Sequence, residues 1–123
     1  MSAFQYVRVI ADSGGGSRFE DPNVSMSSVD YAPPAAPVEF ADLGAAVSVS
    51  VIRGDSGWEG EVFHPAPARQ WMFVLAGSGE VRTTDGDSRR FAPGGAFLFE
   101  DTVGEGHSSR FFDETTIAVV RVS

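Results

Sequence analysis

The chain contains only two histidines, and both stand where chemistry near neutral pH would be sought. His64 opens the segment His-Pro-Ala-Pro-Ala-Arg-Gln that ends at Gln70, and His107 closes the segment Gly-Glu-Gly-His. Both lie at turns that lead into predicted β-strands. Imidazole serves as acid, base or metal ligand in this pH range. Because the chain has neither cysteine nor lysine, these two histidines are the first candidates for a functional site.

The composition narrows the classes of function. The 123 residues are the size of one domain, and 42% hydrophobic residues with ten Phe are enough for a core. A formal charge of −8 argues against a nucleic-acid partner, because phosphate binding uses a basic patch. Without lysine there is no Schiff-base nucleophile or phosphate-loop lysine. Without cysteine there is no disulfide, thiolate catalysis or cysteine zinc site.

The N-terminal sequence and the apolar runs bear on the cellular compartment. The first residues lack the basic-then-apolar layout of a signal peptide. No apolar run approaches the length that spans a bilayer. The lack of cysteine fits a reducing compartment. We therefore expect a soluble, cytoplasmic protein with no membrane partner.

The first part of the chain predicts one strand followed by an extended arm. Residues 4–10 alternate loosely and contain enough β-branched residues for a strand. Residues 13–17 form a Gly-rich break, and residues 20–37 are polar and Pro-rich, which favours an arm with short edge-strand pieces. Residues 40–46 are the only stretch that could hold a helical turn, and Gly44 argues against a longer helix.

From residue 47 onward the pattern predicts short strands. Val47, Val49 and Val51 alternate with serines, as expected of a half-buried strand. Short strands with Gly and Pro turns at regular spacing indicate an antiparallel sandwich or barrel. The further predicted strands are 58–64, 71–75, 80–84, 89–92, 96–100, 107–112 and 116–122.

Two segments resemble the sequence motifs of the cupin family. The first cupin motif places a histidine pair before a glutamate, which is followed by six residues and a glycine. Here His64 lies six residues before Gln70, and Gln70 is followed by six residues and Gly77. The match is carried by His64 and the glycine, with Gln70 at the place of the glutamate.

The second cupin motif begins with a glycine and ends with a histidine and an asparagine. Here Gly95 is followed by five residues, by Asp101-Thr-Val-Gly and, after two more, by His107. This matches with one inserted residue and with Asp in place of Pro. The likeness to small single-domain cupins extends over about residues 17–122, including Phe19-Glu-Asp.

The resemblance implies an all-β fold, the cupin-type double-stranded β-helix, which is a jelly-roll barrel with an extended N-terminal arm. Residues 1–123 would form a single cupin domain, with the N-terminal strand and Pro-rich arm in 1–46 and the barrel in 47–123. Small cupins commonly dimerise by packing their sheets and exchanging an N-terminal arm. A homodimer is therefore expected, and it would also cover exposed β edges.

The sequence departs from the cupin pattern at the metal ligands. The second histidine of the family's site falls at Ala66, its glutamate at Gln70 and its closing asparagine at Phe111. Two imidazoles and a neutral amide are a weak set of ligands for a divalent ion. We therefore expect no cofactor. The alternative is Fe, Mn, Ni or Zn held by His64, Gln70 and His107, with help from a carboxylate of Glu61, Glu100 or Asp101.

Strand parity predicts the wall of a small-molecule pocket. Alternate residues of a barrel strand face inward. If Gln70 faces the cavity, Met72 and Val74 do so as well, while Trp71 and Phe73 pack on the outside. By the same parity His107, Ser109 and Phe111 face inward. The candidate substrate-binding residues are Trp58, Met72, Val74, Asp101, Ser109 and Phe111.

Three functions fit these features. The first is an isomerase, cyclase, dehydratase or lyase that acts on a small organic molecule, with His64 and His107 transferring protons and Gln70 stabilising an oxyanion. The second is a metal-dependent oxygenase or lyase that uses His64, Gln70 and His107. The third is a non-catalytic binder of a small ligand. Each histidine taken alone is more often structural than functional, and it is their joint position at both motifs that favours a site.

Overall fold

The computed structural model describes residues 2–123, and within them every side chain except that of Glu61. None of these residues is helical, so none forms a helix that could cross a membrane. The prediction of an all-β protein is confirmed. The strands are β1 (Ala3–Gln5), β2 (Val7–Ala11), β3 (Ser17–Glu20), β4 (Asn23–Ser25), β5 (Ser27–Val29), β6 (Val38–Phe40), β7 (Ala46–Gly54), β8 (Glu59–His64), β9 (Gln70–Ala76), β10 (Gly79–Arg82), β11 (Ser88–Phe91), β12 (Ala96–Phe99), β13 (His107–Phe111) and β14 (Thr115–Val122).

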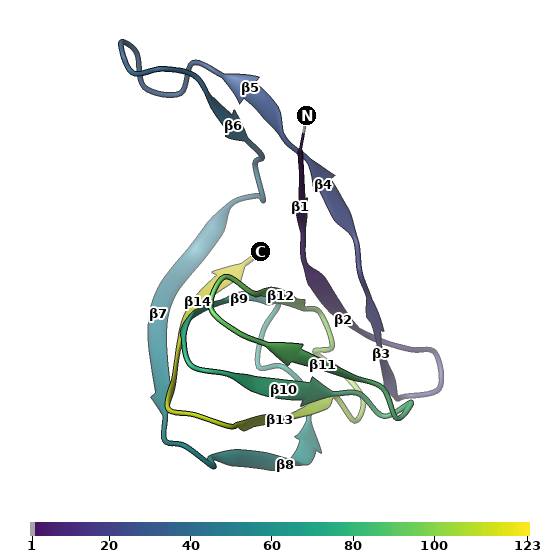
Figure 1. Ribbon diagram of the computed structural model, residues 1–123. Helices are drawn as coiled ribbons and strands as arrows, with labels where there is room; N and C mark the ends of the chain where they lie inside the picture. Colours follow the sequence, from purple (N-terminus) through teal and green to yellow (C-terminus); the bar gives the residue numbers. More distant parts are fainter. Residues whose placement is uncertain (1) are drawn as a thin grey trace.

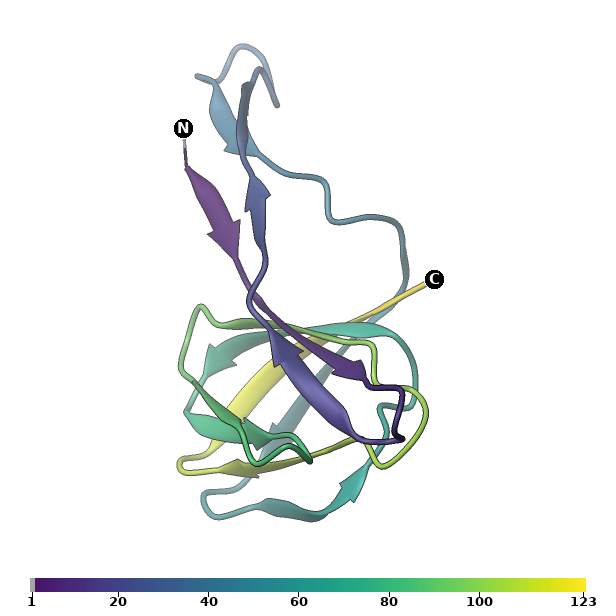
Figure 2. The same ribbon diagram turned by 90° about the vertical axis from the view of Figure 1, so that its right-hand side faces the viewer.

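Two larger sheets pack against each other and enclose the core. One has the strand order β11-β10-β13-β8 and the other the order β3-β2-β12-β9-β14-β7. The small sheets β1-β4 and β5-β6 extend away from them (Figures 1 and 2). All pairs are antiparallel except β2 and β12, which are parallel. The expectation of purely antiparallel pairing is wrong for that pair, because no hairpin fixes the direction of two strands so distant in sequence.

The core lies between the two larger sheets and follows the period-two alternation of their strands. On β12, Phe97 and Phe99 belong to the main apolar cluster, which both sheets share. Leu98 points to the opposite face and packs with Trp71 and Val122. Burying each large apolar side chain contributes about 1.5–3 kcal/mol to stability. Both faces of β12 are therefore covered, which agrees with its unbroken apolar sequence.

The N-terminal elements differ in detail from the prediction. The expected strand over residues 4–10 is two strands, because the chain leaves the ladder at Tyr6, whose N–H donates to the Pro22 carbonyl at 3.3 Å. The Tyr6 ring packs edge-on against Trp71, with ring centres 4.7 Å apart. Strand β3, which pairs with β2, was not predicted. Residues 41–45 lie outside any strand or helix, so the possible helical turn does not form.

Strand β7 does not show the half-buried pattern that its alternation predicts. Val47, Val49 and Val51 are 66%, 69% and 61% exposed. The strand lies at the edge of the six-stranded sheet and pairs only with β14, where Val49 lies opposite Val120. The alternation correctly predicted a strand. Burial was wrongly predicted because it depends on a covering layer that the sequence of β7 does not encode.

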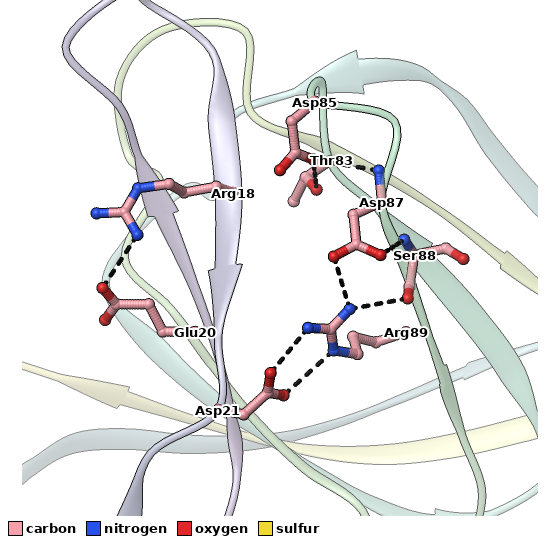
Figure 3. Close-up of polar contacts among 8 residues, drawn as sticks. All are labelled: Arg18, Glu20, Asp21, Thr83, Asp85, Asp87, Ser88 and Arg89. Atoms are coloured by element: carbon pink, nitrogen blue, oxygen red, sulfur yellow. Dashed lines mark hydrogen bonds and ion pairs between the residues drawn. The ribbon is translucent and has the colours of Figure 1, made fainter.

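An arginine joins the edges of the two larger sheets, as Figure 3 shows. Arg89 on β11 donates to Asp21, just after β3, at 3.2 and 2.8 Å, and to Asp87 at 2.8 Å. Its guanidinium also lies 4.7 Å from the centre of the Phe19 ring. The hydrogen bonds from Arg89 lower the pKa of the Asp21 and Asp87 carboxyls, and the two carboxylates raise the pKa of Arg89.

We predict that Arg89→Gln makes the protein less stable at neutral pH and removes part of its sensitivity to acid. A carboxyl whose folded-state pKa is lowered contributes stability that is complete above its usual pKa and is lost as pH falls through the lowered value. Loss of the Arg89–Asp21 pair should cost about 0.5–1 kcal/mol at pH 7. Urea unfolding at pH 7 and near pH 3 measures both effects.

The matched control is Arg121→Gln, because Arg121 is exposed on β14 and makes no ion pair with the residues described. Arg121→Gln should leave the free energy of unfolding unchanged at both pH values. A difference between Arg89→Gln and the wild type that stays constant down to pH 3 would contradict the assigned role of the pair.

Candidate functional site

The two histidines are direct cross-strand neighbours. Strand β8 ends at His64 and strand β13 begins at His107, and the two residues lie opposite each other in the antiparallel ladder. Their ring centres are 4.9 Å apart and the ring planes are inclined by 57°. Opposite residues in a ladder have side chains on one face. Strand pairing therefore brings both imidazoles to the same point of the molecule.

A glycine permits this register. Gly106 has a φ of +74°, and a Cβ at this position would lie 2.0 Å from the His64 carbonyl oxygen. Glycine alone combines the left-handed conformation with so close an approach of two backbones. The carbonyl of Gly106 accepts a hydrogen bond from the buried Ser17 hydroxyl at 2.6 Å. The turn before His107 is thus held against the end of β8 on one side and against β3 on the other.

His107 is buried and is oriented by a carboxylate. Its Nδ1 lies 2.6 Å from Oδ2 of Asp101, a residue with no exposed surface. The ring of Phe99 packs on the imidazole, with ring centres 4.4 Å apart. Because a carboxylate accepts, Nδ1 carries the proton and Nε2 keeps its lone pair in the neutral ring. The arrangement is an Asp–His dyad, in which the acid fixes the tautomer and orientation of the base.

His64 occupies a different environment. Its side chain is exposed, and Nδ1 lies 3.2 Å from the carbonyl oxygen of Pro65. A carbonyl only accepts, so this contact also leaves Nε2 of the neutral ring without a proton. The site therefore has an inner imidazole backed by Asp101 and an outer imidazole in contact with solvent.

Both imidazoles line one cavity of about 170 Å³ between the two larger sheets. The four-stranded sheet contributes His107 and Ser109, and the six-stranded sheet contributes Gln70. The exposed residues Ile52 and Trp58 mark where the cavity meets the surface. The other lining residues are His64, Pro67, Met72, Val74, Val81, Phe91, Phe97, Phe99, Phe111 and Ile117.

The polar groups of the cavity lie on strands that carry or meet His107, since Gln70 pairs opposite Phe99, whose ring packs on that imidazole, and Ser109 follows it on β13. Gln70 is 8% exposed, and its amide has no hydrogen-bond partner among residues 2–123 as described. The Ser109 hydroxyl likewise has none within that part of the chain. Both groups face the cavity with hydrogen-bonding capacity to spare, so they can bind a polar group of a ligand. The remaining wall is hydrocarbon and aromatic, and none of the lining side chains is an acid or an arginine.

The structure brings most of the sequence-predicted residues together. Trp58, Met72, Val74, Ser109 and Phe111 line the cavity with the two histidines and Gln70. Trp71 packs on the outer face of its sheet, as strand parity predicts. Asp101 does not line the cavity but lies behind His107 and bonds to it.

Several wall residues were not among the predicted contacts. The rings of Phe91, Phe97 and Phe99 form much of the wall. The sequence held a signal for two of them, because Phe97 and Phe99 alternate along β12 in the manner of inward-facing residues. The positions of Ile52 and Ile117 depend on the pairing of β7 with β14, which no local pattern specifies.

The donor set does not fit a resident divalent metal. No three His, Cys, Asp or Glu residues come together among the described side chains. Ala66 is buried and donates its N–H to the Asp101 carbonyl at 3.0 Å. The predicted help from Glu61 falls on a side chain outside the described residues. What remains at the cavity is two imidazoles and a neutral amide, fewer strong ligands than such ions use in proteins.

Glu100, another carboxylate considered for the metal, is engaged elsewhere. Burial raises its pKa, but hydrogen bonds from Arg69 and Arg8 outweigh that effect and leave the pKa below its usual value. The Arg69 Nε atom lies 2.5 Å from its Oε2. The side chain is thus a salt-bridged carboxylate of the outer sheet face and does not line the cavity.

Comparisons with known proteins add no family assignment. No protein-family model matches this chain, and no curated protein matches it.

We predict that Gly106→Ala disrupts the pairing of the histidines. The new Cβ would collide with the His64 backbone, so β13 must shift against β8. The control is Gly86→Ala, because Gly86 has a φ of +88° but no atom within 4 Å of a Cβ. The control should lose about 1–2 kcal/mol from left-handed strain alone. Gly106→Ala should lose at least about 2 kcal/mol more.

Urea unfolding measures the two free energies, and the NMR resonances of the imidazole protons report on the site. Gly106→Ala should shift the resonances of both rings, whereas Gly86→Ala should leave them in place. Equal destabilisation by the two substitutions would contradict the role of Gly106 in setting the register.

Proposed function

We propose that the protein is a small enzyme of the cupin type that acts on a small organic molecule by acid–base chemistry, without a resident metal. The Asp101–His107 hydrogen bond at a cavity that also holds a second imidazole supports this reading most directly. An oriented imidazole whose lone pair is free can remove a proton from a bound molecule. The lack of charge elsewhere on the cavity wall leaves this polar end as the place of reaction.

The first step common to isomerases, cyclases and lyases of this kind is removal of a proton from a carbon next to a carbonyl. His107 Nε2 accepts the proton, and the C–H electron pair forms the carbon–carbon double bond of an enolate. The carbonyl π pair moves to oxygen, where the Gln70 amide N–H donates a hydrogen bond. Asp101 stabilises the positive charge that His107 gains.

The outer histidine completes the proton balance. His64 is in contact with solvent, so it can take up a proton. Where a carbon–carbon double bond of the substrate is conjugated with the enolate, His64 delivers the proton to the far carbon of this dienolate, the double bond moves, and an isomer forms. If the enolate carbon instead attacks a second carbonyl, a ring forms, and His64 protonates the new alkoxide. If a leaving group sits on the next carbon, the electron pair expels it, and His64 protonates that group. The three outcomes share one base and differ in the substrate.

Two alternatives make different predictions. A metal-dependent oxygenase or lyase would carry a stoichiometric transition metal after purification, held by His64, Gln70 and His107. A non-catalytic binder would use the same cavity with no proton transfer. The buried carboxylate behind His107 favours the enzyme over the binder, because a group that only holds a ligand has no need of an oriented base.

We predict that the wild-type protein exchanges the acidic C–H protons of 2-indanone for deuterium in D₂O. This neutral ketone undergoes only the first step of the proposed reactions, so it tests the base without the unknown substrate. The exchange rate should fall about 10²-fold or more in His107→Ala. It should fall less in His64→Ala, because solvent can supply the second proton. Proton NMR of the ketone follows the exchange.

Three further measurements separate the alternatives. Added imidazole should restore part of the rate in His107→Ala, as expected when a free base replaces a missing one. Asp101→Asn keeps the shape of the acid, yet ¹⁵N NMR of His107 should show a changed mixture of ring tautomers together with slower exchange. Treatment with a chelator should leave the rate unchanged. Equal rates in the wild type and the double His→Ala variant, or a loss of rate on chelation, would overturn the proposal.

We also propose a jelly-roll barrel that forms a homodimer through the exposed face of β7. This edge strand presents Val47, Val49 and Val51 to solvent, and such apolar patches mark association surfaces. Its unpaired edge can meet the same edge of a second copy across a two-fold axis, so one surface matches itself. A second copy would pair the backbone edge and bring the valines of the two β7 strands together as cross-strand neighbours on one face.

We predict that sedimentation velocity gives twice the mass of the chain for the wild type and the mass of one chain for Val49→Glu/Val51→Glu. Charge on the shared face should separate the copies without affecting the core. Val62→Glu is the control, since Val62 is 80% exposed on β8, the edge strand of the other sheet. A monomeric wild type, or a dimer that persists in the double variant, would contradict this interface.

A further inference from the structure

We infer that the ligand of the cavity is a neutral compound of about one ring, with a single carbonyl or hydroxyl group that binds at the histidine end. This inference rests on the proposed function and names its substrate class. It follows from three features of the wall, which are its volume, its lack of charge and the one-sided placement of its polar atoms.

The volume limits the size of the ligand. The cavity of about 170 Å³ is close to the size of an apolar cavity, about 150 Å³, that accommodates benzene in a protein core. The walls are rigid, because Phe91 packs edge-on against both Phe97 and Phe111. Such rings have few rotamers and fix the space between them. One substituted ring, or one ring fused to a five-membered ring as in 2-indanone, fits this space, and a larger fused system would have to extend past Trp58 into solvent.

The wall carries no charged group other than what the two imidazoles could acquire, and this disfavours an anionic ligand. No arginine lines the cavity to pair with a carboxylate or phosphate, and the chain has no lysine. An unpaired charge in an apolar site costs several kcal/mol. Asp101 lies directly behind His107, and its carboxylate would repel an anion. These features together argue against acids and phosphate esters.

A cationic ligand is disfavoured by the chemistry of the base. The aromatic wall would attract a cation, but no carboxylate lines the cavity to pair with it. His107 must become positively charged when it accepts a proton, and a bound cation would oppose that step. A neutral ligand avoids both costs.

The polar atoms fix the orientation of the ligand. Gln70 is the one strongly buried polar side chain on the wall that has no hydrogen-bond partner in the described chain, and its amide offers a donor and an acceptor. Its neighbours on β9, Met72 and Val74, continue the wall as hydrocarbon. A ligand with one oxygen at the Gln70 end and hydrocarbon at the other satisfies the whole surface.

The inference is tested with three planar probes of equal size that differ in charge. Acetophenone is neutral, benzoate is an anion and benzamidinium is a cation, and all have the same number of non-hydrogen atoms. Titration of the wild-type protein, followed by methyl NMR, should show acetophenone binding at least about 10-fold more tightly than either charged probe. The shifted methyl groups should be those of Met72 and Ile117 on the wall, while exposed Leu75 stays unchanged.

A charge placed at the wall should reverse the preference. Gln70→Glu adds a carboxylate of nearly the same shape, and it should make benzamidinium the tightest of the three probes. Gln5→Glu is the matched control, because Gln5 is exposed on β1. The control should retain the order of the wild type. Benzoate or benzamidinium binding as tightly as acetophenone to the wild type, no binding of any probe, or shifts away from the cavity would overturn the inference.

The outcome is separable from that of the proposed function. Acetophenone preference without exchange of 2-indanone protons would retain the ligand class and overturn the acid–base mechanism. Exchange of 2-indanone with no preference among the three probes would retain the mechanism and overturn the ligand class.

Discussion

The close approach of Gly106 to the His64 backbone is the constraint on which the site depends. It sets the register at the start of β13 against the end of β8, and that local register makes His64 and His107 neighbours. A slip of one residue would turn every side chain of β13 to the opposite face. His107 would then leave Asp101 and the cavity together. This backbone contact thus fixes the position of His107 at the start of β13. The wall residues that follow are held by pairing with β10, because the ladder with β8 shifts register between His107 and Ser109.

Aromatic packing explains why a cavity persists in so small a core. Phe97 stacks on Phe99, while Phe91 meets Phe97 and Phe111 edge-on. Flexible aliphatic side chains could move into the gap, whereas these rings have few alternative positions. The cavity wall is carried by strands of both larger sheets and not by loops. The same side chains therefore stabilise the core and line the binding cavity. A bound ligand would make the packing contacts that the cavity leaves unmade.

Much of the fold could be predicted from local patterns, because strand length and alternation are local properties. The strands after residue 46 and the inward parity of Gln70, Met72 and Val74 belong to this group. The parallel pairing of β2 with β12 and the exposure of β7 could not be predicted, because they depend on partners distant in sequence or on a covering layer. The position of each strand within its sheet depends on pairing between segments that are distant in sequence.

The candidate site likewise combines features that the local sequence predicts with features that depend on distant parts of the chain. The two histidines could be identified because their residue type is rare in this chain. Asp101 stands where the motif that this segment resembles usually has a proline, and no local pattern indicated that it pairs with His107 rather than with a ligand. That pairing arises because residues 100–106 fold back under β13, where the Asp101 carbonyl also receives the Ala66 N–H. Only the three-dimensional path of this loop makes the carboxylate an orienting group.

The two carboxylate oxygens of Asp101 differ in what they contact, since only Oδ2 meets His107. Asp101 Oδ1 is buried without a hydrogen-bond partner among the described residues. Glu80 Oε1, the other buried oxygen of this kind in that part of the chain, still lies 3.0 Å from Arg110 Nε. An unmet buried acceptor costs about 1–3 kcal/mol. This cost opposes the stability that the contact with His107 contributes, and it is compatible with the proposed role of Asp101 in orienting the imidazole that faces the cavity.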